Sequence, residues 1–298
     1  MEYRIVWASQ IMDEHSGASS LKECTLEKKQ ICSELKAIWR ESFRDPDEYI
    51  DLFLGRRFVA ENTILAISNL QIIGMAYLLP MTIHTGQREL PAVFGYALGV
   101  RKAFRGKGIS KKIIDLICRY CDDNNYIFLF SPANIELSAY YKRIGLKEAG
   151  KIRKCIYHYT GKYQISNIKI TDISSEEYTR LRDTFLKDMI YVKWDEAAID
   201  YAIAENRFSG GFCKKLEYQN MEYAILGYVM EEKLIIAEAI IPEHLISEIF
   251  PKIAMYFRTQ TITAYLPEGC ISEGTVIPWI MGYKADILEK GYCSLLLN

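Results

Sequence analysis

The stretch from Ala92 to Arg143 restricts the fold more than any other part of the chain. It opens with an apolar run that ends at Val100, continues through a basic turn with two glycines, and then shows apolar residues at helical spacing from Ile109 to Cys121. A short apolar run, Tyr126 to Phe130, is long enough for a buried strand and too short for a helix, and a second amphipathic helix is predicted over 136–143. The order strand, turn, helix, strand, helix predicts an α/β fold.

The basic turn has the features of an anion site. Six of the twelve residues from Arg101 to Lys112 are basic. A helix N-terminus presents unpaired N–H groups, and Gly106 and Gly108 allow phosphate oxygens to approach the backbone. The spacing does not match other phosphate loops, because Lys111 stands where a dinucleotide fingerprint needs its third glycine and Arg101 where a Walker A loop needs its first. For an isolated turn of this kind, a bend with a solvated basic face is the more common explanation.

The residues before this stretch predict further elements. A helix is expected from Ile31 to Phe43, and a second one after Asp45 as N-cap, with Gly55 as its stop. Two apolar runs, 64–67 and 72–79, predict a β-hairpin.

A similar order of elements recurs in the second half. Ser174 to Glu177 is a capping signal, and the predicted elements that follow are a helix over 195–205, strands over 223–230 and 234–241, a helix over 243–257 and a strand over 261–266. A chain of 298 residues, half of them hydrophobic, also suits two domains. We therefore predict domains at residues 1–162 and 163–298.

Charge and composition exclude several classes of protein. The 37 basic and 38 acidic side chains give a formal net charge of -1, which predicts neither nucleic acid nor an anionic membrane as a partner. No apolar run reaches the roughly 18 residues of a membrane span, and we expect a cytoplasmic protein. Cys118 and Cys121 spell CxxC but fall inside a predicted helix, so they are interpreted as core residues. The histidines show no ligand spacing, so no metal is predicted.

Two motifs in order resemble a known superfamily. Leu98-Gly99-Val100 followed by Phe104 to Ser110 resembles the acetyl-CoA motif R/Q-x-x-G-x-G/A of the GNAT acetyltransferases and the strand that enters it. Asn134, Tyr141 and the Gly145-Leu146 pair match the family's later N-x-x-A, Y and G-F positions. The resemblance implies two GNAT-like domains, each with a mixed, mostly antiparallel central sheet flanked by helices.

The resemblance also assigns roles to individual residues. It implies that the backbone of Leu98, Gly99 and Val100 holds the pantetheine arm and polarises the thioester, and that Tyr141 protonates or hydrogen-bonds the departing CoA thiolate. Asn134 would cap the following helix or touch the cofactor. The pyrophosphate would be held by consecutive residues of the turn: Arg105, Gly106, Lys107, Gly108, Ile109 and Ser110. Departures from the pattern, such as Ser110 for glycine or alanine and Leu146 for phenylalanine, remove no backbone N–H group.

The function implied is an N-acetyltransferase that moves an acetyl group from acetyl-CoA directly to a primary amine on a small molecule or peptide. The alternatives are a non-catalytic acyl-CoA sensor and a tandem GNAT-like aminoacyl transferase. Glu61, Tyr96 and His84 lie in segments that could line the acceptor cleft, and none is singled out as general base.

The second half is not expected to bind CoA. It has Glu243 where the first half has its basic turn. Its expected task is to complete the acceptor pocket or to form the interface of a homodimer.

Overall fold

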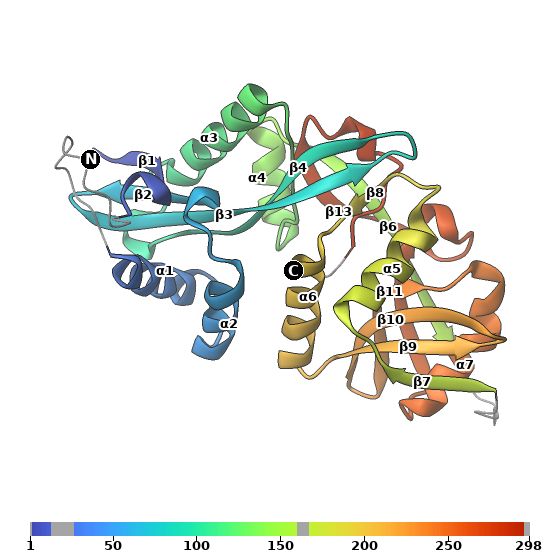
Figure 1. Cartoon of the computed structure of the whole chain (residues 1–298). Coiled ribbons are helices and arrows are strands. Elements are labelled where there is room, and N and C mark those ends of the chain that lie inside the picture. Colours follow the sequence, from blue (N-terminus) through green and yellow to red (C-terminus); the bar gives the residue numbers. More distant parts are fainter. Residues whose placement is uncertain (1, 13–26, 160–166, 295–298) are drawn as a thin grey trace. The chain divides into compact units, whose positions relative to one another are not determined.

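The computed structural model describes residues 2–12, 27–159 and 167–294, which fold into two compact units (Figure 1). The first unit contains Met1–Pro80 and Ala92–Phe130, and the second contains Met81–Pro91 and Ser131–Asn298. The predicted domain boundary between residues 162 and 163 falls within 160–166, outside the described residues.

The strands of the first unit follow one another in chain order across its sheet: β1 (Arg4–Trp7), β2 (Thr63–Ser68), β3 (Gln71–His84), β4 (Glu89–Val100) and β5 (Ile127–Phe130). The β1–β2 and β2–β3 pairs are antiparallel, whereas β4 and β5 are parallel. The predicted hairpin is confirmed as β2–β3, and its turn residues Asn69 and Leu70 have φ values of 47° and 67°. Positive φ at both central positions suits the right-handed twist of the flanking strands.

Helices cover both faces of this sheet. Figure 1 shows α1 (Lys28–Phe43) and α2 (Asp47–Arg57) on one face and α3 (Ile109–Asn124) on the other. The predicted start and stop of α2 are wrong. Pro46 is its N-cap and no side chain caps it, because the carboxylate of Asp45 accepts a hydrogen bond from the indole N–H of Trp39 at 2.8 Å. Gly55 lies inside the helix, which ends at Arg57.

A cluster of aromatic rings joins α1 and α2 to the sheet. Trp39 and Phe53 are 1% and 0% exposed and meet Tyr77 of β3 and Tyr96 of β4. Buried aromatic side chains remove large apolar areas from water, so this layer fixes the two helices on the strands.

The second unit has a longer sheet in the order β13-β6-β12-β11-β10-β9-β7. Only β11 and β12 are parallel in this series. A further strand, β8, pairs with Thr82–His84 at the end of β3. The strands are β6 (Lys147–His158), β7 (Ile168–Asp172), β8 (Tyr191–Lys193), β9 (Phe212–Tyr218), β10 (Met221–Met230), β11 (Lys233–Ile240), β12 (Thr261–Pro267) and β13 (Thr275–Tyr283).

Four α-helices belong to the second unit: α4 (Ile135–Arg143), α5 (Ser175–Leu186), α6 (Glu196–Phe208) and α7 (Glu243–Tyr256). The capping box at the start of α5 is confirmed, since Ser174 accepts from the N–H of Glu177 and the Glu177 carboxylate accepts from the N–H of Ser174. The predicted fold class, a mixed and mostly antiparallel sheet flanked by helices, is confirmed.

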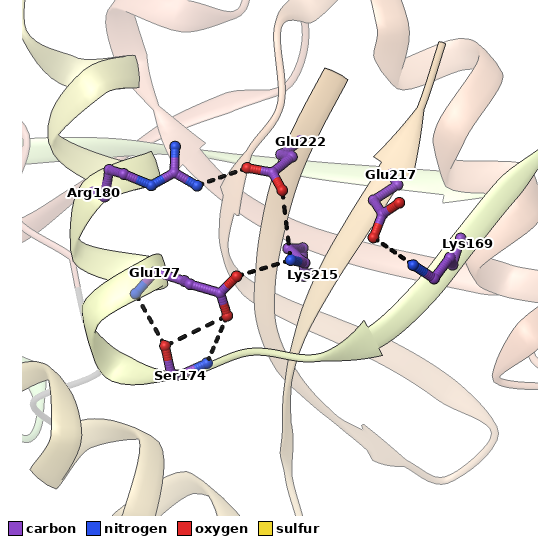
Figure 2. A network of polar contacts seen from close by, with 7 residues as sticks. All are labelled: Lys169, Ser174, Glu177, Arg180, Lys215, Glu217 and Glu222. Atoms are coloured by element: carbon purple, nitrogen blue, oxygen red, sulfur yellow. Dashed lines mark hydrogen bonds and ion pairs between the residues drawn. The ribbon is translucent and has the colours of Figure 1, made fainter. Parts of the chain in front are cut away.

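Ion pairs on the surface fasten α5 to the sheet of the second unit (Figure 2). Lys215 of β9 lies between Glu177 of α5 and Glu222 of β10, at 2.8 and 3.5 Å, and Arg180 of α5 also pairs with Glu222 at 2.6 Å. All four charged groups are at least partly exposed, and each such pair contributes little to the stability of the fold.

A second polar network is completely buried. The guanidinium of Arg182 donates to the carboxylate of Glu238 at 3.1 Å, and both side chains are 0% exposed. The same carboxylate accepts hydrogen bonds from Tyr178 and Tyr292 at 2.7 and 2.9 Å, and Arg182 also donates to the carbonyl of Val192 at 2.8 Å. Burial is the largest single influence and lowers the pKa of Arg182, but Glu238, Tyr292 and Tyr178 together outweigh it and raise that pKa above its ordinary value. The guanidinium of Arg182 therefore stays charged inside the unit.

The described cysteines are all reduced thiols. Cys121 of the CxxC pair is 0% exposed, as predicted for a core residue, whereas Cys118 is half-buried. In the second unit Cys213 and Cys293 are buried at 1% and 4% exposure. Among the helices that the structure describes, none has both the length and the apolarity needed to cross a membrane.

Candidate functional site

Strand β4 extends past its parallel neighbour at the predicted pantetheine segment. The register with β5 runs from Ala92 opposite Ile127 to Gly95 opposite Phe130, where β5 ends. β4 continues to Val100. Parallel strands that separate leave N–H and C=O groups available along the edge that has lost its partner.

A local irregularity marks the point of separation. Ala97 has a φ of 47°, which is the left-handed region that L-residues other than glycine, asparagine and aspartate seldom adopt. Leu98 and Val100 follow it and are half-buried, whereas Gly99 is buried. A Cβ on Gly99 would come within 2.9 Å of the Ser42 hydroxyl, so α1 packs directly on the backbone here. Nothing in the sequence signals the conformation of Ala97.

The two turn glycines are required by backbone conformation. Gly106 and Gly108 both have a φ of 76°, and a Cβ at either position would meet no atom within 4 Å. The space beside both residues is therefore open. An open glycine backbone is what close approach of a phosphate requires.

The start of α3 has no side chain as its cap. Gly108 is the N-cap residue, and the first helical hydrogen bond runs from the N–H of Lys112 to the carbonyl of Gly108 at 3.1 Å. In an α-helix, the N–H groups of the first turn have no acceptor within the helix itself. By contrast, Asn134, a residue of the second unit, caps α4 through its own side-chain oxygen. An uncapped, glycine-flanked helix start fits a diphosphate well.

The basic side chains of this segment divide into two groups. Arg101 is bound to Glu34 and Glu41 at 2.6 and 2.9 Å, and Arg105 donates to the carbonyls of Val100 and Glu41 at 3.0 and 3.1 Å. These two arginines therefore hold the shape of the turn.

The lysines lie differently. Lys111 pairs with Asp115 at 2.8 Å, whereas the ammonium groups of Lys107 and Lys112 lie over the rings of Phe104 and Tyr3 at 5.1 and 4.4 Å. From the sequence alone, the two arginines, which hold the shape of the turn, could not be distinguished from the three lysines, whose ammonium groups lie beside Asp115 or over aromatic rings.

The remaining predicted residues belong to the second unit. Asn134 is the N-cap of α4, and its side-chain oxygen accepts from the N–H of Leu137 at 2.8 Å, which bears out the capping interpretation. Tyr141 is half-buried on the same helix, beside Tyr140 at a ring separation of 5.3 Å. Burial, followed by the neighbouring Tyr140, raises the pKa of Tyr141 to about 12. The phenol therefore keeps its proton through the neutral range.

The three residues considered for the acceptor side lie in different places. His84 belongs to the second unit, where its ring nitrogen lies 3.1 Å from the carbonyl of Lys187. Glu61 is exposed on a short 3-10 turn (Ala60–Asn62). Tyr96 is 7% exposed, and its hydroxyl lies 2.8 Å from that of Tyr49. Sequence reasoning did not connect Tyr96 with Tyr49.

Residues 26–149 match the family model of the acetyltransferase (GNAT) domain. This part of the chain is a GNAT acetyltransferase domain. The matched region contains β4, the glycine turn, α3, Asn134 and Tyr141. No curated protein sequence matches the chain.

Solved structures extend the similarity of fold beyond the GNAT domain. A GCN5-related N-acetyltransferase from Anabaena variabilis has a TM-score of 0.68 at 13% identity, over 94% of this chain and 72% of that one. Eis1 from Mycobacterium abscessus has a TM-score of 0.66 at 8% identity, over 96% and 74%. A probable N-acyltransferase from Enterococcus faecalis has a TM-score of 0.63 at 11% identity, over 87% and 71%. At such identities the likeness concerns the fold.

Proposed function

We propose that the chain is an N-acetyltransferase that carries an acetyl group from acetyl-CoA directly to a primary amine. The observation that carries this proposal is the open turn in the GNAT domain, where Gly106 and Gly108 leave free space beside an uncapped α3. Arg105 to Ser110 would hold the pyrophosphate through backbone N–H groups and the nearby lysines.

Strand β4 supplies the second part of the proposed donor site. Leu98, Gly99 and Val100 lie past the end of the β4–β5 register, where backbone groups of an edge can bind the pantetheine arm. Bound acetyl-CoA supplies an activated thioester. An N–H directed at the thioester oxygen stabilises the negative charge that develops there.

Tyr141 is the proposed acid. The amine nitrogen forms its bond to the acetyl carbon, the C–S bond breaks, and the hydroxyl of Tyr141 gives its proton to the departing thiolate. The proton that the nitrogen loses passes to solvent water, from which the phenol of Tyr141 recovers its own. The raised pKa of Tyr141 supports this role, since the phenol is still protonated when the amine is neutral enough to attack.

The second half of the chain is proposed to be GNAT-like without a donor site. Its parallel β11–β12 pair, with α7 between the two strands in sequence, repeats the arrangement of β4, α3 and β5. At the start of α7, the carboxylate of Glu243 accepts hydrogen bonds from the N–H and hydroxyl of Ser272 at 2.8 and 2.6 Å. A negative charge in this place opposes a phosphate.

The test is release of CoA thiol from acetyl-CoA in the presence of a fixed panel of amines: spermidine, lysine, phenethylamine, kanamycin and a peptide with a free α-amine. We expect at least one amine to accelerate thiol release well above the hydrolysis rate, with an acetylated product of the expected mass. CoA binding in calorimetry without transfer to any amine would favour the sensor alternative. Absence of CoA binding would refute the donor site itself.

A further inference from the structure

Two tyrosine hydroxyls meet on the face of the first unit covered by α1 and α2. Tyr49 comes from α2 and Tyr96 from β4, and their oxygens are 2.8 Å apart. Tyr96 is almost completely buried, whereas Tyr49 is half-buried. The pair therefore lies where the aromatic layer approaches solvent.

The position of Tyr96 in the strand connects the pair to the proposed chemistry. Tyr96 directly follows Gly95, the last residue of β4 in register with β5, and directly precedes the left-handed Ala97. Leu98, which is proposed to hold the thioester, lies two residues further on. Two residues of a strand span about 7 Å along the backbone, so Tyr96 is a near neighbour of Leu98 in the strand that forms part of the proposed donor site.

The aromatic layer holds the pair in place. The ring of Tyr96 stacks on that of Phe53 at 5.1 Å with an interplanar angle of 22°, and Trp39 lies 6.0 Å from Tyr96 and 6.3 Å from Tyr49. The indole of Trp39 is in turn fixed by Asp45. Hydroxyls supported by packed rings need little reorganisation before they bind a ligand.

Other polar side chains near Leu98–Val100 are already hydrogen-bonded to residues of the basic turn. Glu41 binds Arg101 and the N–H of Lys102, and the hydroxyl of Ser42 lies 3.4 Å from Arg105. Their contacts shape the donor side.

We propose that the Tyr49–Tyr96 hydroxyl pair binds and orients the acceptor amine, an inference that rests on the proposed function. A phenol oxygen carries two lone pairs, so it can accept an N–H of the amine while it is bonded to the other hydroxyl. Holding one N–H fixes the direction of the nitrogen lone pair relative to the thioester. The pair acts in binding and orientation, and the reaction requires no change in its covalent state.

The test uses Tyr49→Phe and Tyr96→Phe, which remove the hydroxyls and keep the rings. Tyr77→Phe is the matched control, because Tyr77 is buried in the same aromatic layer and, among the described residues, its hydroxyl donates to the sulfur of Met75 at 3.9 Å, away from the pair. Steady-state kinetics are measured with acetyl-CoA and the amine of the panel that gives the fastest turnover, and thermal melting shows that each variant is folded.

We expect kcat/KM for the amine to fall about three- to tenfold in Tyr49→Phe and Tyr96→Phe, as for loss of one hydrogen bond. The KM for acetyl-CoA should stay unchanged, and Tyr77→Phe should behave as the wild type. The double variant Tyr49→Phe/Tyr96→Phe should lose little more than the worse single variant, because the two hydroxyls act as one unit.

Three results would overturn the inference. An unchanged kcat/KM for the amine in both variants would show that the hydroxyl pair does not bind the amine. An equal loss of kcat/KM in Tyr77→Phe would show that the loss comes from altered packing of the aromatic layer. A raised KM for acetyl-CoA with unchanged use of the amine would place the pair on the donor side. Failure of the proposed function is distinguishable, because the wild-type chain itself would then show no transfer to any amine.

Discussion

Replacing Glu238 by glutamine should destabilise the second unit strongly. The substitution removes the charge that neutralises Arg182, although both side chains are 0% exposed and the guanidinium remains bound to the carbonyl of Val192. Breaking a buried ion pair by removing one partner costs about 3–5 kcal/mol, because the other charge stays in a medium of low polarity. With a urea m-value of about 2 kcal/mol/M, the midpoint of unfolding should fall by about 1.5–2.5 M.

The assay is urea unfolding followed by circular dichroism, with Glu222→Gln as the matched control. Glu222 makes two ion pairs, to Arg180 and Lys215, but its side chain is 39% exposed. Exposed pairs contribute about 0–1 kcal/mol, so the control should shift the midpoint by less than about 0.5 M. The same chemical change is thus compared in a buried and in a solvated network.

A compensating variant separates charge from packing. In Arg182→Met/Glu238→Met neither charge remains, and such replacements of a buried pair are often neutral or stabilising. The double variant should therefore recover most of the stability that Glu238→Gln loses. The recovery is incomplete, because the hydroxyls of Tyr178 and Tyr292 lose the carboxylate that accepts their hydrogen bonds. Equal midpoints for Glu238→Gln and Glu222→Gln would refute the reasoning.

Three further predictions concern the proposed transferase site. Gly108→Asp should abolish CoA binding in calorimetry, whereas Gly108→Asn, of equal size and uncharged, should weaken it less, because it blocks the phosphate without repelling it. The protein has room for both side chains beside Gly108, and equal affinities of the two variants would contradict the phosphate assignment. Tyr141→Phe should lower kcat at least about tenfold without changing the KM for acetyl-CoA. Because burial raises the pKa of Tyr141 to about 12, turnover should show no loss centred near pH 10; a loss there that disappears in Tyr141→Phe would contradict the raised pKa, and an unchanged kcat in Tyr141→Phe would refute its assignment as the acid. Arg105→Lys should weaken CoA binding about three- to tenfold, since an ammonium cannot reproduce the fork that reaches Val100 and Glu41, and unchanged affinity would argue against this role.

The sequence predicted the elements whose signals are local. The stripe from Ile109 to Cys121 became α3, the runs on either side of Asn69 became β2 and β3, and the capping box before α5 formed as expected. Hydrophobic period and cap chemistry act within a few residues, which is why they can be read without knowledge of the tertiary structure. The family resemblance is borne out by the match over residues 26–149, whereas the donor motif within it stays a prediction.

The predictions that failed, and the features that were missed, have causes that local cap and period patterns do not contain. Asp45 has the chemistry of an N-cap, but the indole of Trp39 binds its carboxylate, and Gly55 is tolerated inside α2. The left-handed Ala97 has no sequence signal, because alanine rarely adopts that conformation. The meeting of Tyr49 and Tyr96 likewise needs α2 to pack on β4, which no local pattern specifies.

The buried thiols can be used to measure local unfolding in each unit separately. A thiol reagent attacks the thiolate, and burial raises the pKa of Cys293 to about 12, so labelling at neutral pH requires the surrounding structure to open. Cys121 lies in the first unit, and Cys213 and Cys293 lie in the second. Mass spectrometry of peptides after timed alkylation would therefore give separate opening rates for the two units of the unmodified protein, with no engineered probe.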